Sequence, residues 1–159
     1  MEYKFSNEVT EEKGVEHTEN NKTVVFDQKP TPAFTGASWV ALMAGIVAFC
    51  IGLFNTEMQL NEKGYYFTIL LFGLFSAVSV QKNVRDKLEG LSVTEMYYGI
   101  SWFAALASIT LLVIGLWNAD LDLSEKGFYS MSFLLSLFSA IAVQKNTRDK
   151  KYIDSLKEK

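Results

Sequence analysis

The sequence has little cysteine and, over four long stretches, no charge at all. Its single cysteine, Cys50, cannot form an internal disulfide, which excludes a disulfide-stapled secreted module. No charged residue occurs in residues 30–56, 64–81, 96–119 or 127–144, and each stretch is mostly apolar. Windows of this kind exclude an ordinary soluble domain, a disordered chain and a collagen-like fibre. The sequence therefore predicts a small multi-pass membrane protein.

The apolar stretches have the length of membrane-spanning helices. A bilayer core about 30 Å thick requires roughly 20 apolar helical residues, and a helix satisfies the backbone polar groups that lipid cannot. The four predicted spans are residues 33–54, 64–81, 97–117 and 127–144. We therefore expect an all-α integral membrane fold, with four transmembrane helices arranged as two tandem helical hairpins in the same orientation.

Polar residues beside the apolar windows predict where the helices begin. Asn61 and Ser124 stand where N-caps would stand, so the second and fourth helices are predicted to begin one residue later. Ser92 and Glu95 have the spacing of a capping box before the third helix. The second and fourth windows are short, so we expect their helices to continue into the charged segments that follow, with lysines reaching toward the headgroups.

The distribution of Lys and Arg predicts the orientation. If both termini are cytoplasmic, 13 of the 15 Lys and Arg residues lie on the cytoplasmic side, and only Lys63 and Lys126 lie on the outer side. Cytoplasmic loops carry an excess of these residues. We therefore expect cytoplasmic termini and two short, acidic outer loops near residues 55–63 and 118–126.

The chain contains an internal repeat with a period of 63 residues. Without a gap, residues 38–87 match residues 101–150 at 26 of 50 positions. Each copy holds two spans, so both copies enter the membrane the same way up, and the expected symmetry axis lies along the membrane normal. The predicted units are a disordered acidic cytoplasmic tail (1–32), a first two-helix repeat (33–87), a cytoplasmic connector (88–98), a second two-helix repeat (99–150) and a charged C-terminal tail (151–159).

The doubled pattern G-L-[FW]-N, [NS]-E-K-G-[YF]-Y, L-F-S-A and V-Q-K-N-x-R-D-K resembles the YiaA/YiaB family of bacterial inner-membrane proteins. These proteins are built from a two-helix domain, and the resemblance covers about residues 35–150. The acidic tail of residues 1–30 is longer than the family leads us to expect. The family has no assigned reaction or ligand, so the resemblance implies a multi-pass inner-membrane location and does not indicate what the activity is.

The repeated Gln-Lys-Asn-x-Arg-Asp-Lys segment ends the second and fourth spans. One interpretation is structural, with cations matched to the helix dipole and Lys82 paired with Asp86, as Lys145 is with Asp149, at i,i+4. The other interpretation is a contact with anionic lipid on the cytoplasmic face. The candidate lipid-contact residues are Lys82, Arg85, Lys87, Lys145, Arg148 and Lys150.

The spans themselves contain no Asp, Glu, Lys, Arg or His. Because intramembrane ionisable groups mark proton relays and ion pathways, their absence argues against a proton-coupled pump or antiporter. Small residues form stripes that favour close helix packing. The alternative is that Ser132, Ser136 and Ser139 line a polar path, although a path for a hydrophilic solute needs more polar lining.

The outer loops carry five acidic residues, and hard cations prefer such oxygen ligands. Capping of two helices and simple solvation explain the same residues, and no calcium-loop spacing is present. We therefore assign no metal site. The acidic residues are Glu57, Glu62, Asp120, Asp122 and Glu125.

No nucleophile elbow, phosphate loop or zinc pattern appears, so we expect neither an enzyme nor a cofactor. The net charge of −3 gives no basic patch for nucleic acid. Our first hypothesis is a structural or interaction component of the membrane. It would contact the lipid bilayer, its own copies in a homo-oligomer, and a protein partner through the cytoplasmic tails. The alternative is a small transporter or channel for a neutral solute at the repeat or protomer interface.

Overall fold

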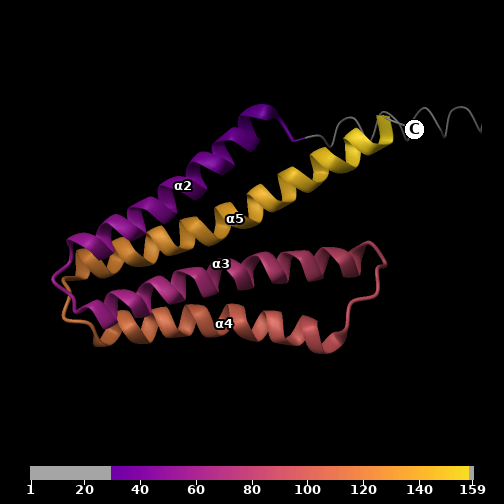
Figure 1. Cartoon of the computed structure of the whole chain (residues 1–159). Helices are drawn as coiled ribbons and strands as arrows, with labels where there is room; N and C mark the ends of the chain where they lie inside the picture. Colours follow the sequence, from indigo (N-terminus) through magenta and orange to yellow (C-terminus); the bar gives the residue numbers. More distant parts are fainter. Residues whose placement is uncertain (1–29, 158–159) are drawn as a thin grey trace, which may run out of the picture.

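The computed structural model describes residues 30–157, and this part of the chain folds into four long α-helices (Figure 1). They are α2 (Pro32–Asn55), α3 (Leu60–Leu88), α4 (Glu95–Asn118) and α5 (Leu123–Lys157). Each helix is long and apolar enough to cross a membrane. The predicted all-α, four-span fold is confirmed.

The helices extend beyond the apolar windows. α3 and α5 continue through the charged segments, as expected, and α5 carries the helix through the predicted charged tail as far as Lys157. Residues 89–94 connect α3 to α4, so the connector is shorter than predicted. Of the predicted disordered tail (1–32), residues 1–29 lie outside the described residues.

Three predicted helix starts are wrong. Asn61 and Ser124 lie inside the first turns of α3 and α5, and α4 follows Thr94 rather than Ser92. Before α3, the Gln59 N–H donates to the Glu62 carboxylate at 2.9 Å. The start of α5 repeats this contact at 3.1 Å, with a carboxylate that again lies three residues along the chain. The acidic residues of the first turns therefore set these starts.

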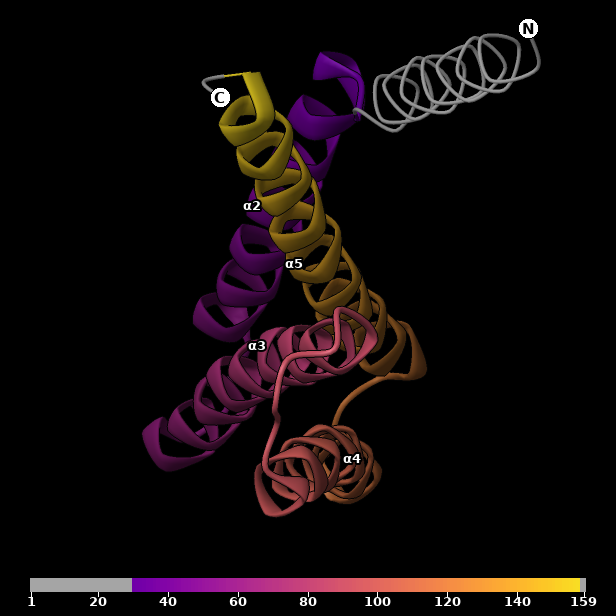
Figure 2. The ribbon, with the colours of Figure 1, turned by 90° about the vertical axis from the view of Figure 1, so that its right-hand side faces the viewer.

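The tight helix pairs join the two repeats. α2 packs along α5, α3 packs along α4, and α3 also contacts α5 at the centre. Figures 1 and 2 both show the α2–α5 pair on one side and the α3–α4 pair on the other. α2 and α3 are consecutive in the chain but pack much less against each other. The first helix of each repeat therefore packs against the second helix of the other repeat.

The two second helices form the inside of the bundle. In the most apolar window of each helix, 39% of the window is buried inside the bundle for α3 and α5, against 22% for α2 and α4. The outer helices are accordingly more apolar, with mean hydropathies of 2.2 and 2.1 against 1.4 for the inner ones. A more apolar surface suits helices that face lipid on most sides.

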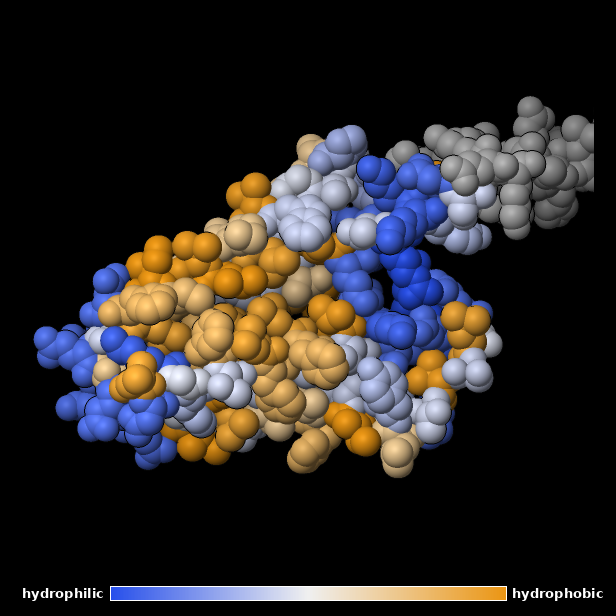
Figure 3. Space-filling model, viewed as in Figure 1, coloured by the Kyte–Doolittle hydropathy of each residue, from blue (hydrophilic) through white to orange (hydrophobic). Residues whose placement is uncertain are grey.

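The bundle has two distinct ends. The short-loop end holds residues 56–59 and 119–122, and the connector end holds residues 89–94, the start of α2 and the end of α5. In Figure 3, hydrophilic side chains gather toward both ends, and apolar side chains cover the middle. Phe75, Phe103 and Phe138 are 67–73% exposed. Apolar patches of this extent are rare on soluble monomers, and a lipid environment accounts for them.

A core of aromatic and aliphatic side chains fills the half of the bundle nearer the short-loop end. Phe49, Leu70 and Phe133 are fully buried there. The Phe49 and Tyr129 rings meet edge to face with centroids 5.4 Å apart, and Tyr66 stacks on Tyr129 at 6.1 Å. The rings come from α2, α3 and α5, so this cluster joins both repeats.

Candidate functional site

The residues shared by the two copies form contacts between the copies. The first contact brings a glycine of one repeat against two aromatic rings of the other. A Cβ at Gly52 would lie 2.8 Å from Phe128 Cε1, and a Cβ at Gly115 would lie 2.7 Å from Tyr65 Cε1. These separations are too short for any side chain, so the close approach requires glycine at both positions.

A second shared contact joins two buried amides to two buried hydroxyls. Asn83 Nδ2 of α3 donates to Ser101 Oγ of α4 at 2.9 Å. At the equivalent positions, Asn146 Nδ2 of α5 donates to Ser38 Oγ of α2 at 3.1 Å. Each asparagine is only 2% exposed. Because unpaired polar groups are costly away from water, these bonds fix which helices pair.

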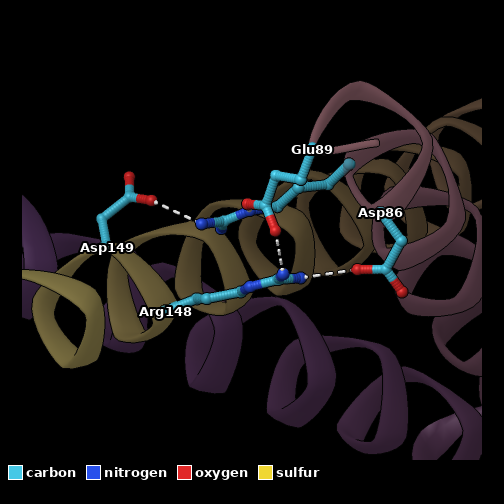
Figure 4. Close-up of polar contacts among 5 residues, drawn as sticks. Asp86, Glu89, Arg148 and Asp149 are labelled. Atoms are coloured by element: carbon cyan, nitrogen blue, oxygen red, sulfur yellow. Dashed lines mark hydrogen bonds and ion pairs between the residues drawn. The ribbon is translucent and has the colours of Figure 1, made fainter. Parts of the chain in front are cut away.

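The third shared contact is a reciprocal pair of ion pairs between α3 and α5 (Figure 4). Arg85 Nη2 lies 3.3 Å from Asp149 Oδ1, and Arg148 Nη1 lies 3.0 Å from Asp86 Oδ1. Glu89 bridges the two arginines, through Arg85 Nε at 2.7 Å and through Arg148 Nη2. We call these five residues the Arg–Asp cluster. Three carboxylates and two guanidiniums partly neutralise one another at the connector end.

The cluster changes the interpretation of the charged segments. Asp86 pairs with Arg148 and not with Lys82, and Asp149 pairs with Arg85 and not with Lys145. The predicted i,i+4 pairs are therefore wrong. The physical reason is that the arginine of the facing helix presents a planar donor fork, which suits a carboxylate better than a flexible ammonium does.

Three of the six candidate lipid-contact residues are in ion pairs, namely the two arginines and Lys87. Arg85 and Arg148 belong to the Arg–Asp cluster. Lys87 donates to Glu95 Oε1 at 2.9 Å and lies 4.8 Å from the centroid of the Tyr98 ring. The remaining three are exposed lysines: Lys82, Lys145 and Lys150.

A groove of about 870 Å³ opens between α3, α4 and α5 toward the connector end. Most of its lining is aliphatic or aromatic, and its charged residues are Arg85, Lys145 and Asp149. Its apolar lining includes Val80, Val84 and Leu88 of α3, Trp102, Ala105 and Ile109 of α4, and Leu137, Ile141 and Ile153 of α5.

A more polar hollow of about 760 Å³ lies at the short-loop end. Four of the five acidic loop residues line it, and Asp122 is the exception. Two of the four, Glu62 and Glu125, accept backbone hydrogen bonds at the helix starts. Within residues 30–157, no group of three or more His, Cys, Asp and Glu side chains is placed to hold a metal ion.

The three candidate path serines lie inside the bundle on α5. Ser132 and Ser136 donate to carbonyls of their own helix, at 2.8 Å and 2.7 Å. Ser136 lies where α2 approaches closely, because a Cβ at Gly45 would meet Ser136 Oγ at 2.5 Å. Ser139 is 1% exposed, and its hydroxyl has no hydrogen-bond partner among the described residues. These contacts favour helix packing, and the polar path stays a prediction.

Sequence reasoning did not identify the asparagine–serine bonds or the glycine–aromatic contacts. The signal was present, because all four of the bonded polar residues are identical in the two copies. Ser38 and Ser101 lie inside apolar spans, where a repeated polar residue needs a partner, whereas the two asparagines lie just past the spans, in the charged segments. The repeat alone does not say which helix supplies that partner.

Comparison with known proteins agrees with the repeat. The yiaA/B two helix domain matches residues 34–86 and again residues 97–149. The chain is 60% identical to "Inner membrane protein YiaA" of Escherichia coli (strain K12) over 119 residues, covering 75% of this chain and 82% of that protein. It is 37% identical to "Uncharacterized membrane protein YubF" of Bacillus subtilis (strain 168) over 65 residues, covering 40% and 75% of the two chains.

A third relative is "Inner membrane protein YiaB" of Escherichia coli (strain K12), which is 28% identical over 96 residues, covering 60% of this chain and 81% of that protein. No solved structure matches the chain. The printed names of these relatives state a membrane location and no activity.

Proposed function

The chain belongs to the family of the yiaA/B two-helix domain and is a multi-pass inner membrane protein, and from this we propose that it is a non-catalytic structural component of that membrane. Its role in this proposal is to hold one fixed arrangement of helices and to present its connector end to a protein partner. The single observation that carries the proposal is the Arg–Asp cluster.

The cluster supports a scaffold because it acts together with the other contacts between repeats. The Arg–Asp pairs connect α3 to α5, and the asparagine–serine bonds connect α3 to α4 and α5 to α2. All four helices are therefore tied by polar contacts near one end, while aromatic rings fill the other end. A bundle held at both ends suits a structural role better than a moving one.

The same features weigh against the channel alternative. The aromatic core fills the interior of the bundle in the half nearer the short-loop end. Two of the three path serines, Ser132 and Ser136, donate hydrogen bonds to carbonyls of their own helix. No described contact favours a route for a neutral solute. If sealed vesicles containing the protein admitted small neutral solutes faster than empty vesicles, the scaffold proposal would be wrong.

The proposal places both termini and the connector in the cytoplasm, because Lys and Arg gather at that end. Cysteine labelling tests this in a Cys50→Ser background. We expect a membrane-impermeant maleimide to label Asp120→Cys at the short-loop end of intact cells, and Lys150→Cys only after the membrane is permeabilised. The reverse pattern would refute the orientation.

Partner binding is tested by crosslinking in intact membranes, followed by affinity isolation of the full chain. We expect one defined protein to co-isolate, and we expect its recovery to fall when residues 1–29 are deleted. Arg148→Ala, which keeps residues 1–29 but disrupts the Arg–Asp cluster, is the matched control. It shows whether recovery of the partner falls because the tail is missing or because the helix arrangement is weakened. Isolation of no specific protein with the full chain would contradict the proposal.

A further inference from the structure

The groove between α3, α4 and α5 exists because the two repeats end differently. α5 continues to Lys157, so Tyr152 and Ile153 extend along the groove and line it. Shifted by 63 residues, the equivalent positions are Glu89 and Gly90, which follow the end of α3 at Leu88. The continuation of α5 past the second repeat therefore supplies an apolar wall that has no counterpart after α3.

The groove lies at the depth of lipid. Trp102 and Ile109 belong to the apolar stretch of α4, and Ile141 belongs to that of α5. The groove is open, and its volume of about 870 Å³ lies within the range of sites that hold small ligands. An open apolar groove at this depth faces acyl chains, because the helices around it cross the bilayer.

The charge at the groove selects among lipids. Of the three charged residues that line the groove, Arg85 is paired with Asp149, so the cation left is Lys145, which is exposed and belongs to none of the ion pairs of residues 30–157. Lysines near helix ends reach to the headgroup region. An anionic headgroup therefore complements this rim, whereas a zwitterionic headgroup brings its own cation.

We propose that this groove binds one anionic phospholipid, with its acyl chains against Trp102 and Ile109 and its phosphate at Lys145. Tyr152, at the same rim, offers a hydroxyl donor to the headgroup. The groove is lined by Lys145 and not by its repeat equivalent Lys82, which separates the site from a general attraction between lysines and an acidic membrane surface. It does not depend on which side of the membrane the connector end faces.

Quenching of Trp102 by brominated lipid tests the site directly. The full chain with Trp39→Phe and Trp117→Phe keeps Trp102 as its only tryptophan. It is reconstituted in phosphatidylcholine vesicles that contain increasing fractions of brominated phosphatidylglycerol or, in parallel, brominated phosphatidylcholine. We expect half-maximal quenching at a several-fold lower fraction of the anionic lipid. Equal quenching by the two lipids would overturn the proposal.

The repeat supplies a matched control. Lys145→Gln is expected to weaken the preference for the anionic lipid about fivefold, because one lysine near an anionic membrane surface contributes an attraction of about that size. Lys82→Gln changes the equivalent lysine, which does not line the groove, and is expected to leave the preference unchanged. An equal effect of the two substitutions would show general surface attraction and would overturn the site.

A second variant tests the groove without changing its charge. Ala105→Phe places a ring into the groove and is expected to remove the preference for the anionic lipid. Native mass spectrometry of the unmodified chain gives an independent readout, with one phosphatidylglycerol retained by the wild type and lost from Ala105→Phe and Lys145→Gln. Circular dichroism confirms that each variant is helical. Retention of the lipid by folded Ala105→Phe would contradict the proposal.

Discussion

Removal of Arg148 measures how strongly the Arg–Asp cluster holds the repeats together. Its guanidinium contacts Asp86 at 3.0 Å and also pairs with Glu89, and the Asp86 side chain is only 16% exposed. An exposed ion pair contributes about 0.2–1 kcal/mol, whereas breaking a buried one costs about 3–5 kcal/mol. The cluster is partly buried, so we expect Arg148→Ala to lower the free energy of unfolding by about 1–3 kcal/mol.

Thermal unfolding of the purified chain in nanodiscs, followed by circular dichroism, provides the assay. For a chain of this size each kcal/mol shifts Tm by about 2–4 °C, so the expected decrease is about 2–12 °C. Lys82→Ala is the control, because this exposed lysine on α3 is in no described ion pair and does not line the groove. We expect its effect to stay within about 0.5 kcal/mol.

A double-mutant cycle with Asp86→Ala isolates the pair. If the two side chains act together, the double variant loses less stability than the sum of the single variants, by at least about 0.5 kcal/mol. Additive losses would show that Arg148 and Asp86 do not stabilise the fold through each other. The cluster would then not help to hold the repeats together, and the main support for the scaffold proposal would be lost.

Three further predictions use the same thermal assay or simple co-purification. Gly52→Ala forces a Cβ to 2.8 Å from Phe128 Cε1 and is expected to destabilise the fold by about 1–3 kcal/mol, whereas Gly64→Ala, with open space around it, is expected to be neutral or slightly stabilising. Ser101→Ala leaves the Asn83 amide unpaired and is expected to cost about 0.6–2 kcal/mol; an unchanged Tm would refute a role for this bond. A chain split after residue 91 is expected to yield two halves that co-purify in equal amounts, because the tight pairs α2–α5 and α3–α4 each join both halves; recovery of separate monomers would contradict the observed packing.

The spans could be predicted because lipid imposes a simple requirement on composition, and four uncharged windows meet it. The start of α3 was predicted wrongly, since Asn61 and Gln59 are both polar and the choice depended on the carboxylate of Glu62. Which helices pack against each other could not be predicted from the sequence. A four-residue loop makes packing within each hairpin the default expectation, and a repeat shows which residues are equivalent without showing which ones touch.

Only part of the candidate site could be predicted from the sequence, because a repeat shows which residues are equivalent without showing which ones touch. The repeated charged segment pointed to an important end of the bundle, but Asp86 had a cation within reach on its own helix and another on the facing helix. Only the tertiary arrangement decides between Lys82 and Arg148. The groove was not predictable, because it depends on the continuation of α5 past the end of the repeat.

The exchange of partners between repeats also sets an order for biogenesis. Ser38 and Asn146 are 108 residues apart in the chain, so at about 5–20 residues per second the ribosome needs roughly 5–20 s to make the second after the first. During that interval α2 sits in the bilayer without the helix against which it will pack. The α3–α4 pair is able to form earlier, from adjacent segments. The last helix to be synthesised therefore completes the fold, and until it arrives the Ser38 hydroxyl lacks its partner on α5.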